Sequence, residues 1–158
     1  MMQPHLKMQC VMVLGFLITA VMGASGADDA NEDAIKKDRK RIEGTWKIVR
    51  FVINGNSSTD DAAKMIVVNG ADGSWNLTVD GQEIVQGTTT IDPSKKPKTI
   101  DITPTTGDDK GKIYLGIYEV GDDTRKLCFA PTGKPRPTEF TSVSGSDHIL
   151  VMFERVKK

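Results

Sequence analysis

Residues that carry reaction chemistry are scarce in this sequence, which has only two cysteines and two histidines. Residues 1–27, which are predicted to be a signal peptide, contain one cysteine and one histidine, so the mature chain would keep only Cys128 and His148. One cysteine cannot form an internal disulfide, and one histidine supports neither a multi-histidine metal site nor a Ser-His-Asp triad with a histidine to spare. Packing must therefore hold the core, and we expect no metal ligand and no cofactor. Cys128 lies in a strand-like run, where a buried, inert thiol is the better interpretation.

An excess of charge of one sign is also missing, because Lys and Arg together number 21 and Asp and Glu together number 21. The chain therefore has no net field that would hold it on nucleic acid or on an anionic membrane, and neither partner is expected. The mature chain has no glycine-rich nucleotide-binding loop and no Gly-x-Ser-x-Gly nucleophile motif. We expect a protein that is not an enzyme and has no catalytic residue. The enzymatic alternative would need Asp101, Arg136 and Glu139 to converge.

A long hydrophobic run occurs only near the amino terminus. Residues 8–22 are mostly apolar, follow Lys7 and precede Ser25-Gly26-Ala27, which are small residues of the kind found at cleavage sites. The pattern predicts a signal peptide over residues 1–27 and export to the periplasm or the extracellular space. A retained anchor is the alternative, but the run is shorter than the roughly 20 residues that a membrane span needs. No membrane insertion is expected after cleavage.

Residues 28–43 are predicted to form an acidic segment and a short helix in front of the main domain. Acidic residues come first and basic residues last, which suits the dipole of a helix. The apolar positions are only Ala34, Ile35 and Ile42, so the helix has a narrow apolar stripe and should cover another surface. The basic cluster at residues 36–41 is interpreted as a solvated helix face in preference to a patch for an anionic ligand.

Residues 44–158 are predicted to form one all-β domain. The β-branched and aromatic run after Gly44 favours a first strand, and Asn54-Gly55 and Asp80-Gly81 are typical of hairpin turns. Further strand-like runs and turn signals recur about every ten residues. The expected strands cover residues 45–53, 64–68, 74–79, 82–91, 98–103, 112–120, 124–130 and 148–156, with a short edge piece at 138–143.

Eight strands at this spacing predict a mostly antiparallel, up-and-down barrel, with a two-sheet sandwich as the alternative. The interior of a closed eight-stranded barrel is either filled by side chains or holds one small ligand. We therefore expect non-catalytic binding of a small apolar molecule inside the barrel or at its mouth. The alternative is a filled barrel that acts through its loops as a structural or protein-interaction domain. The candidate ligand-binding residues, which strand alternation would turn inward, are Trp75, Leu77, Leu115, Ile117, Val151 and Phe153.

Five ordered blocks carry a resemblance to a known family. They are residues 44–49 (Gly-Thr-Trp-Lys-Ile-Val), 92–101, 116–118, 127–130 and 136–140 (Arg-Pro-Thr-Glu-Phe). With these blocks and an arginine near the end of the last strand, residues 38–156 resemble an uncharacterised family of small secreted bacterial proteins with a lipocalin-like domain. The resemblance implies a lipocalin-like barrel and an exported location, and it supplies no ligand or catalytic residue.

Two structural features are expected from this arrangement. The first and last strands of a closed barrel pair antiparallel, which brings Trp46 beside Arg155, and a guanidinium stacked on the indole would plug that end. Lipocalin-type proteins are known for such a pairing; the alternative is an exposed Arg155 and a Trp46 packed only under the helix. Prolines on both sides of Arg136 limit the entropy cost of ordering it, so we expect an acid to tether Arg136 and Phe140 to be buried. The predicted structural residues are Gly44, Trp46, Arg136, Phe140 and Arg155.

Overall fold

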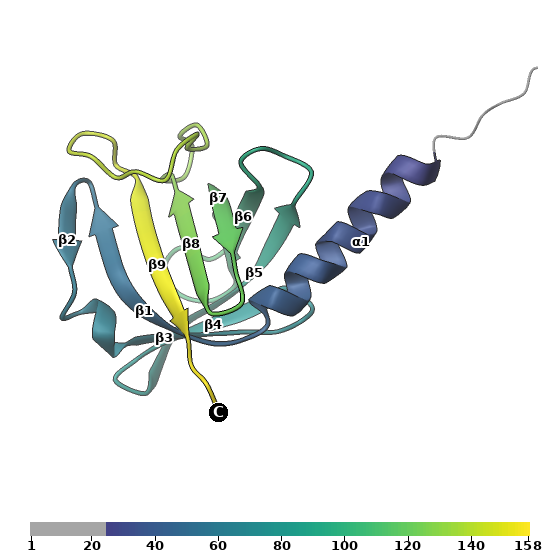
Figure 1. Cartoon of the computed structure of the whole chain (residues 1–158). Helices are drawn as coiled ribbons and strands as arrows, with labels where there is room; N and C mark the ends of the chain where they lie inside the picture. The colour runs from purple at the N-terminus through teal and green to yellow at the C-terminus, as the bar shows by residue number, and fades with distance from the viewer. Residues whose placement is uncertain (1–24) are drawn as a thin grey trace, which may run out of the picture.

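The computed structural model describes residues 25–158, which form one α-helix followed by a sheet that closes on itself (Figure 1). The helix, α1 (Ser25–Ile42), begins earlier than the sequence predicts. Most of the predicted signal peptide therefore lies outside the described residues, and its last three residues belong to α1. Over the range that the structure describes, no helix is both long enough and apolar enough to cross a membrane.

Eight antiparallel strands form a closed barrel, as the sequence predicts. Each strand pairs with its neighbour along the chain, and the last strand pairs back to the first over a register that runs from Trp46 opposite Arg155 to Ile53 opposite Ile149. Closure leaves no free edge among these eight strands. The barrel strands are β1 (Gly44–Ile53), β3 (Met65–Asn69), β4 (Ser74–Val79), β5 (Gln82–Asp92), β6 (Thr99–Pro104), β7 (Tyr114–Val120), β8 (Thr124–Phe129) and β9 (Ile149–Arg155).

Two tight turns have the backbone that their sequences favour. Asp80 and Gly81 have φ of 51° and 79° and join β4 to β5, while Asn54 and Gly55 have φ of 49° and 84°. Both pairs have the positive φ at successive residues that the common two-residue hairpin turn requires. The second turn leads into a short additional strand, β2 (Asn56–Ser58), which lies between two of the predicted strands and was not among them. A 3-10 turn, η1 (Ala62–Lys64), then returns the chain to β3.

A bulge in β1 changes which of its side chains face the interior. The pairing of β1 with β9 shifts register between Ile48 and Arg50, so Val49 has no direct partner. An extra residue of this kind bends the strand and reverses its alternation. Before the bulge, Trp46 and Ile48 belong to the inner core; after it, Val52 belongs to the cluster on the outside of the barrel.

The alternation predicted for β7 is wrong. Tyr118 belongs to the inner core, whereas Ile117 packs on the outside of the barrel with Cys128 and Leu150. Leu115 is two residues before Ile117 in the same strand, so it is on the outer face as well. The sequence of β7 is apolar at odd and even positions, so periodicity could not distinguish the two faces. Both faces are covered because the segment after β8 lies over the outer one, and a strand that is buried on both sides loses its alternation.

That covering segment, residues 130–148, is a loop, so the edge piece predicted at 138–143 is not a strand. Phe140 packs against the outer cluster but is only half-buried, less than expected. Cys128 is fully buried beneath the segment, and its Sγ lies 3.3 Å from the carbonyl oxygen of Thr141. Burial raises the pKa of this thiol, in agreement with the predicted inert cysteine.

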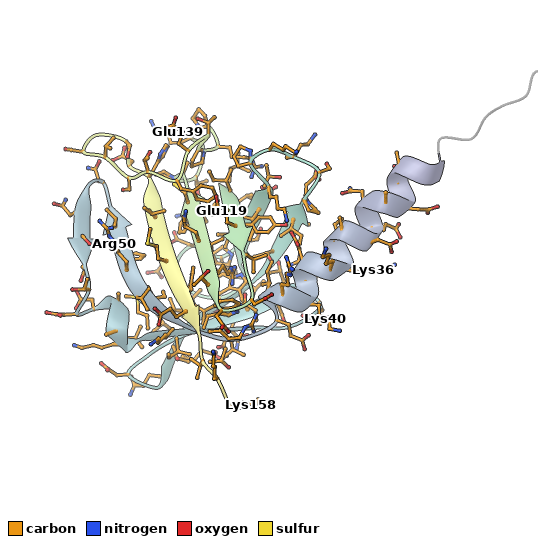
Figure 2. All side chains as sticks on the ribbon, in the orientation of Figure 1. Lys36, Lys40, Arg50, Glu119, Glu139 and Lys158 are labelled. Atoms are coloured by element: carbon orange, nitrogen blue, oxygen red, sulfur yellow. The ribbon has the colours of Figure 1, made fainter. Side chains whose placement is uncertain are left out.

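Helix α1 contacts the barrel only through its carboxyl-terminal part and projects away from it elsewhere (Figure 1). Ile42 is 2% exposed and joins the inner core, with Ile35 packed against it. Lys36 and Lys40 lie on the exposed side of the helix (Figure 2), as a solvated basic face requires. Arg39 of the same cluster departs from this prediction, because it is partly buried and bonds Thr89 of the barrel. The helix thus covers one end of the barrel, which we call the closed end; the end where β9 begins is the open end.

Candidate functional site

A stacked tryptophan and arginine plug the closed end, as the sequence predicts. The guanidinium carbon of Arg155 lies 4.2 Å from the ring centroid of Trp46, and Trp46 is completely buried. The indole Nε1 of Trp46 donates a hydrogen bond of 2.7 Å to the carbonyl oxygen of Ile42 at the end of α1. The positively charged group lies over the electron-rich face of the indole, which is the favourable arrangement for a cation and an aromatic ring.

The Arg155 guanidinium also ties three chain segments together. Its Nη1 donates to the carbonyl of Glu43 at 2.8 Å, its Nε donates to the carbonyl of Asp122 at 2.7 Å, and its Nη2 donates to the carbonyl of Arg41. These carbonyls belong to the end of α1 and to the turn between β7 and β8. Gly44 passes so close that an added Cβ would lie 3.0 Å from Nη1, at a φ of 115°.

A buried polar network seals the rest of the closed end. Asp38 of α1 is 3% exposed, and its Oδ2 accepts hydrogen bonds of 2.7 Å from the Tyr118 hydroxyl and from Lys98 Nζ. Burial and the Asp38 carboxylate both raise the pKa of Tyr118 far above its ordinary value. Arg39 donates through Nη1 to Thr89 Oγ1 at 2.6 Å. Ligand entry from this end would have to break these contacts.

Between the plug and the open end lies an apolar cavity of about 120 Å³. Its walls come from seven strands of the barrel, and most are aliphatic or aromatic side chains of the inner core. Three polar residues interrupt these walls. The lining residues are Ile48, Val67, Asn69, Trp75, Leu77, Thr89, Ile102, Arg125, Leu127, Phe129, Val151 and Phe153.

A wider hollow of about 490 Å³ lies at the open end. Three residues, Trp75, Ile102 and Phe129, line both this hollow and the inner cavity, so the two spaces adjoin at these side chains. The outer hollow also has Ile84, which is 56% exposed, at its rim. The outer hollow is mostly apolar, with Asp108 and Asp109 also in its lining. Concave, mostly apolar spaces with a few polar groups are typical of small-molecule sites.

The predicted ligand-binding residues separate into two groups. Trp75, Leu77, Val151 and Phe153 all line the inner cavity, as expected from the alternation of β4 and β9. Leu115 and Ile117 do not, because the alternation of β7 is inverted. Ile117 instead faces the loop segment that carries Arg136.

Sequence reasoning missed the polar end of the cavity. Arg125 is 5% exposed and Asn69 is 6% exposed, and the Arg125 Nη1 donates a hydrogen bond of 3.2 Å to Asn69 Oδ1. Arg125 alternates along β8 with Leu127 and Phe129, and this pattern could have predicted that Arg125 faces the interior. Asn69 ends a short strand beside a turn, where an asparagine is ordinary, so its burial had no signal in the sequence.

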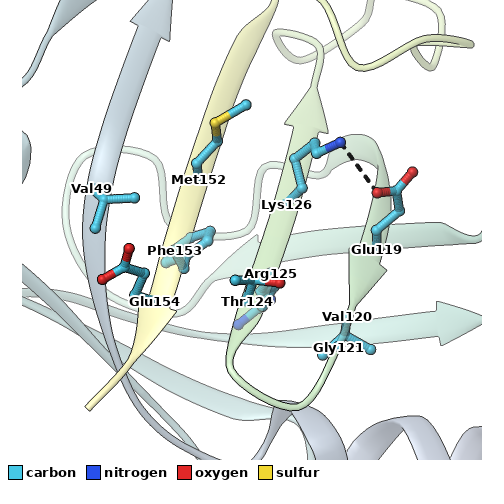
Figure 3. Close-up of a pocket in the computed structure, with 10 residues that line it drawn as sticks. All are labelled: Val49, Glu119, Val120, Gly121, Thr124, Arg125, Lys126, Met152, Phe153 and Glu154. Atoms are coloured by element: carbon cyan, nitrogen blue, oxygen red, sulfur yellow. Dashed lines mark ion pairs between the residues drawn. The ribbon is translucent and has the colours of Figure 1, made fainter.

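A second hollow, of about 370 Å³, opens on the surface across β7, β8 and β9 (Figure 3). Its surface charges pair with one another or with a neighbour: Lys126 Nζ lies 3.2 Å from Glu119 Oε2, and Glu154 lies 3.0 Å from Lys47. Arg125, which also lines the inner cavity, is the remaining charged residue of this hollow. Exposed pairs of this kind are ordinary surface features. The surface pairs present no unmet ligand chemistry, and Arg125 is buried beside the inner cavity, so we take the interior cavity as the candidate site.

Arg136 holds the outer loop on the barrel. It donates to Asp101 Oδ1 at 2.7 Å and to the carbonyls of Ile100 at 3.0 Å and Gly116 at 2.6 Å, so the predicted tether to an acid is confirmed. Glu139, the third member of the enzymatic alternative, is exposed. No cluster of three potential metal-ligating side chains occurs among residues 25–158.

Comparison with family models, with curated proteins and with solved structures found no match to this chain. The resemblance to small secreted lipocalin-like proteins therefore stays a prediction, and a functional proposal has to rest on the geometry of the barrel.

Proposed function

We propose that this protein is an exported, non-catalytic binding domain that takes a small apolar molecule into its barrel through the open end. The observation that carries the proposal is the apolar cavity beside Trp75, with a wider apolar hollow next to it. The opposite end is stabilised by the Trp46–Arg155 plug, so the open end is the practical route of entry.

The small volume of the inner cavity limits the ligand. An apolar cavity of about 150 Å³ inside a protein core holds one benzene-sized molecule. A cavity of about 120 Å³ would thus hold a compact group, while the remainder of the ligand occupies the vestibule. Burial of apolar ligand surface supplies about 25 cal/mol per Å², from which the entropy cost of association is subtracted, so the affinity should rise with the length of the buried apolar part.

Tryptophan fluorescence provides a direct test because the chain has only two tryptophans and only Trp75 lines the cavity. In the Trp46→Phe variant, Trp75 is the only reporter. Titration with octan-1-ol, a neutral amphiphile, should change the fluorescence emission of Trp75, and the change should reach a plateau as the site fills. Absence of a saturable change both with octan-1-ol and with octanoate, confirmed by calorimetry on the wild type, would favour the filled-barrel alternative, in which the loops carry the function.

A matched pair of variants locates the binding. Val67 lines the cavity, whereas its neighbour Val68 is 42% exposed on the outside of the same strand. Val67→Phe should fill the cavity and abolish octanol binding, and Val68→Phe should leave it unchanged. Equal effects of the two substitutions would place the binding elsewhere. Export, the remaining part of the proposal, is tested by amino-terminal sequencing of the protein secreted by its own host, with residue 28 expected first.

A further inference from the structure

The inner cavity contains a buried guanidinium without a carboxylate partner. Arg125 is 5% exposed and belongs to none of the ion pairs among residues 25–158. Its protein contacts are the hydrogen bond of 3.2 Å to Asn69 Oδ1 and the ring of Phe153, whose centroid lies 5.1 Å from the guanidinium carbon. Neither contact supplies negative charge. A buried charge is normally paired, because removing an ion from water is costly.

Three residues that line the cavity each have a buried N–H group without an acceptor among residues 25–158. These groups are Nε of Arg125, Nδ2 of Asn69 and Nε1 of Trp75. Asn69 and Trp75 are direct cross-strand partners on β3 and β4, so their side chains are adjacent. Because Asn69 Oδ1 accepts from Arg125, its amide nitrogen is the group left to donate. Among the lining residues, the buried polar side-chain atoms without a hydrogen-bond partner are thus all donors, and none is an acceptor.

The charge near this end of the cavity is also positive. The pKa of Arg125 is lowered to about 10 by burial and by the nearby Arg39, so the side chain remains charged at neutral pH. Arg39 comes from α1, and its guanidinium is bonded to Thr89, which is another lining residue. An anion placed at the polar end would meet favourable charge and donors together, and the remaining walls would contact an apolar tail.

We infer that the ligand is an amphipathic carboxylate, whose head group accepts hydrogen bonds from Arg125, Asn69 and Trp75 while its short apolar tail points toward the open end. This inference rests on the proposed function, since it names the chemical class of the molecule that the cavity binds. A planar carboxylate offers two acceptor oxygens to a guanidinium, and its small head group suits the limited volume of the inner cavity.

The test compares two probes of nearly equal shape, octanoate and octanamide, by calorimetry at neutral pH on protein expressed from the full-length sequence. The wild type should bind octanoate at least about tenfold more tightly than octanamide, because hydrogen bonds to charged groups are stronger than those between neutral groups. This comparison needs no substitution, so it holds even if a cavity variant fails to fold.

Two neighbouring residues of β8 provide the variant and its control. Arg125→Met should weaken octanoate binding about tenfold to a hundredfold and change octanamide binding by less than about threefold. Lys126→Met removes a positive charge from the next residue, which faces outward and pairs with Glu119, and it should leave the affinity for octanoate unchanged. Trp75→Phe, which removes one donor, should produce a smaller loss.

The outcomes separate this inference from the proposed function. If the wild type binds octanol and octanamide as tightly as octanoate, and Arg125→Met has no selective effect, the barrel binds apolar molecules but the carboxylate inference is overturned. If none of the three probes binds, the proposed function itself fails. A loss of octanoate binding that is equal in Arg125→Met and Lys126→Met would reflect only the net charge and would also overturn the inference.

Discussion

Replacing Arg155 with methionine tests the closed end of the barrel most directly. Methionine keeps an unbranched apolar stem like that of arginine and removes the guanidinium. The substitution therefore deletes the stack of 4.2 Å on Trp46 and the hydrogen bonds to the carbonyls of Glu43, Asp122 and Arg41. It leaves the strand pairing of β9 with β1 in place.

The expected loss follows from these contacts. The stack on a fully buried indole contributes about 0.5–2 kcal/mol. Each hydrogen bond to a carbonyl contributes about 1 kcal/mol, and the more exposed carbonyls recover part of this through water. We expect Arg155→Met to lower the free energy of unfolding by about 2–4 kcal/mol.

Urea unfolding followed by circular dichroism measures this loss, provided that the slope with denaturant is unchanged. Lys157→Met is the matched control, because Lys157 is 75% exposed and makes only a surface ion pair of 3.1 Å with Asp123. The control should change stability by less than about 0.5 kcal/mol. A double-mutant cycle with Trp46→Phe should give a coupling above about 0.5 kcal/mol. Strict additivity, or a wild-type stability for Arg155→Met, would refute the plug.

Three further expectations concern other parts of the barrel. Tyr118→Phe removes the hydrogen bond to Asp38 and should cost about 1.5–3 kcal/mol at neutral pH, as measured by urea unfolding. Because the pKa of Tyr118 is raised in the folded state, the folded protein keeps a proton that the unfolded chain loses near pH 10. The free energy of unfolding of the wild type should therefore fall above that pH, and that of Tyr118→Phe should fall less. An equal fall in the two proteins would contradict this explanation. Gly87→Ala would place a Cβ 2.4 Å from Trp75 Cζ2, so it should lower the free energy of unfolding by about 1–3 kcal/mol and shift the fluorescence emission of Trp75. An unchanged spectrum would show that the ring does not rest on this glycine. Cys128 should react with Ellman's reagent only after unfolding, and rapid reaction of the native protein would show that the outer loop opens.

Local chemistry explains why the sequence was enough to predict the barrel. The turn residues Asp80-Gly81 adopt a backbone that few other residues favour, and the alternating run before them needs one buried face, so strand positions follow from neighbours in the chain. The Trp46–Arg155 contact also follows, because closure of an even number of up-and-down strands leaves only one way to pair the first strand with the last.

Only the tertiary structure decided what faces the cavity. The orientation of β7 depends on a loop, residues 130–148, that covers its outer face, and no periodicity within β7 records that cover. The polar end of the cavity brings together Asn69, Trp75 and Arg125 from three strands. Each residue is ordinary in its own segment. Burial turns them into unmatched donors, and burial is a property of the closed barrel as a whole.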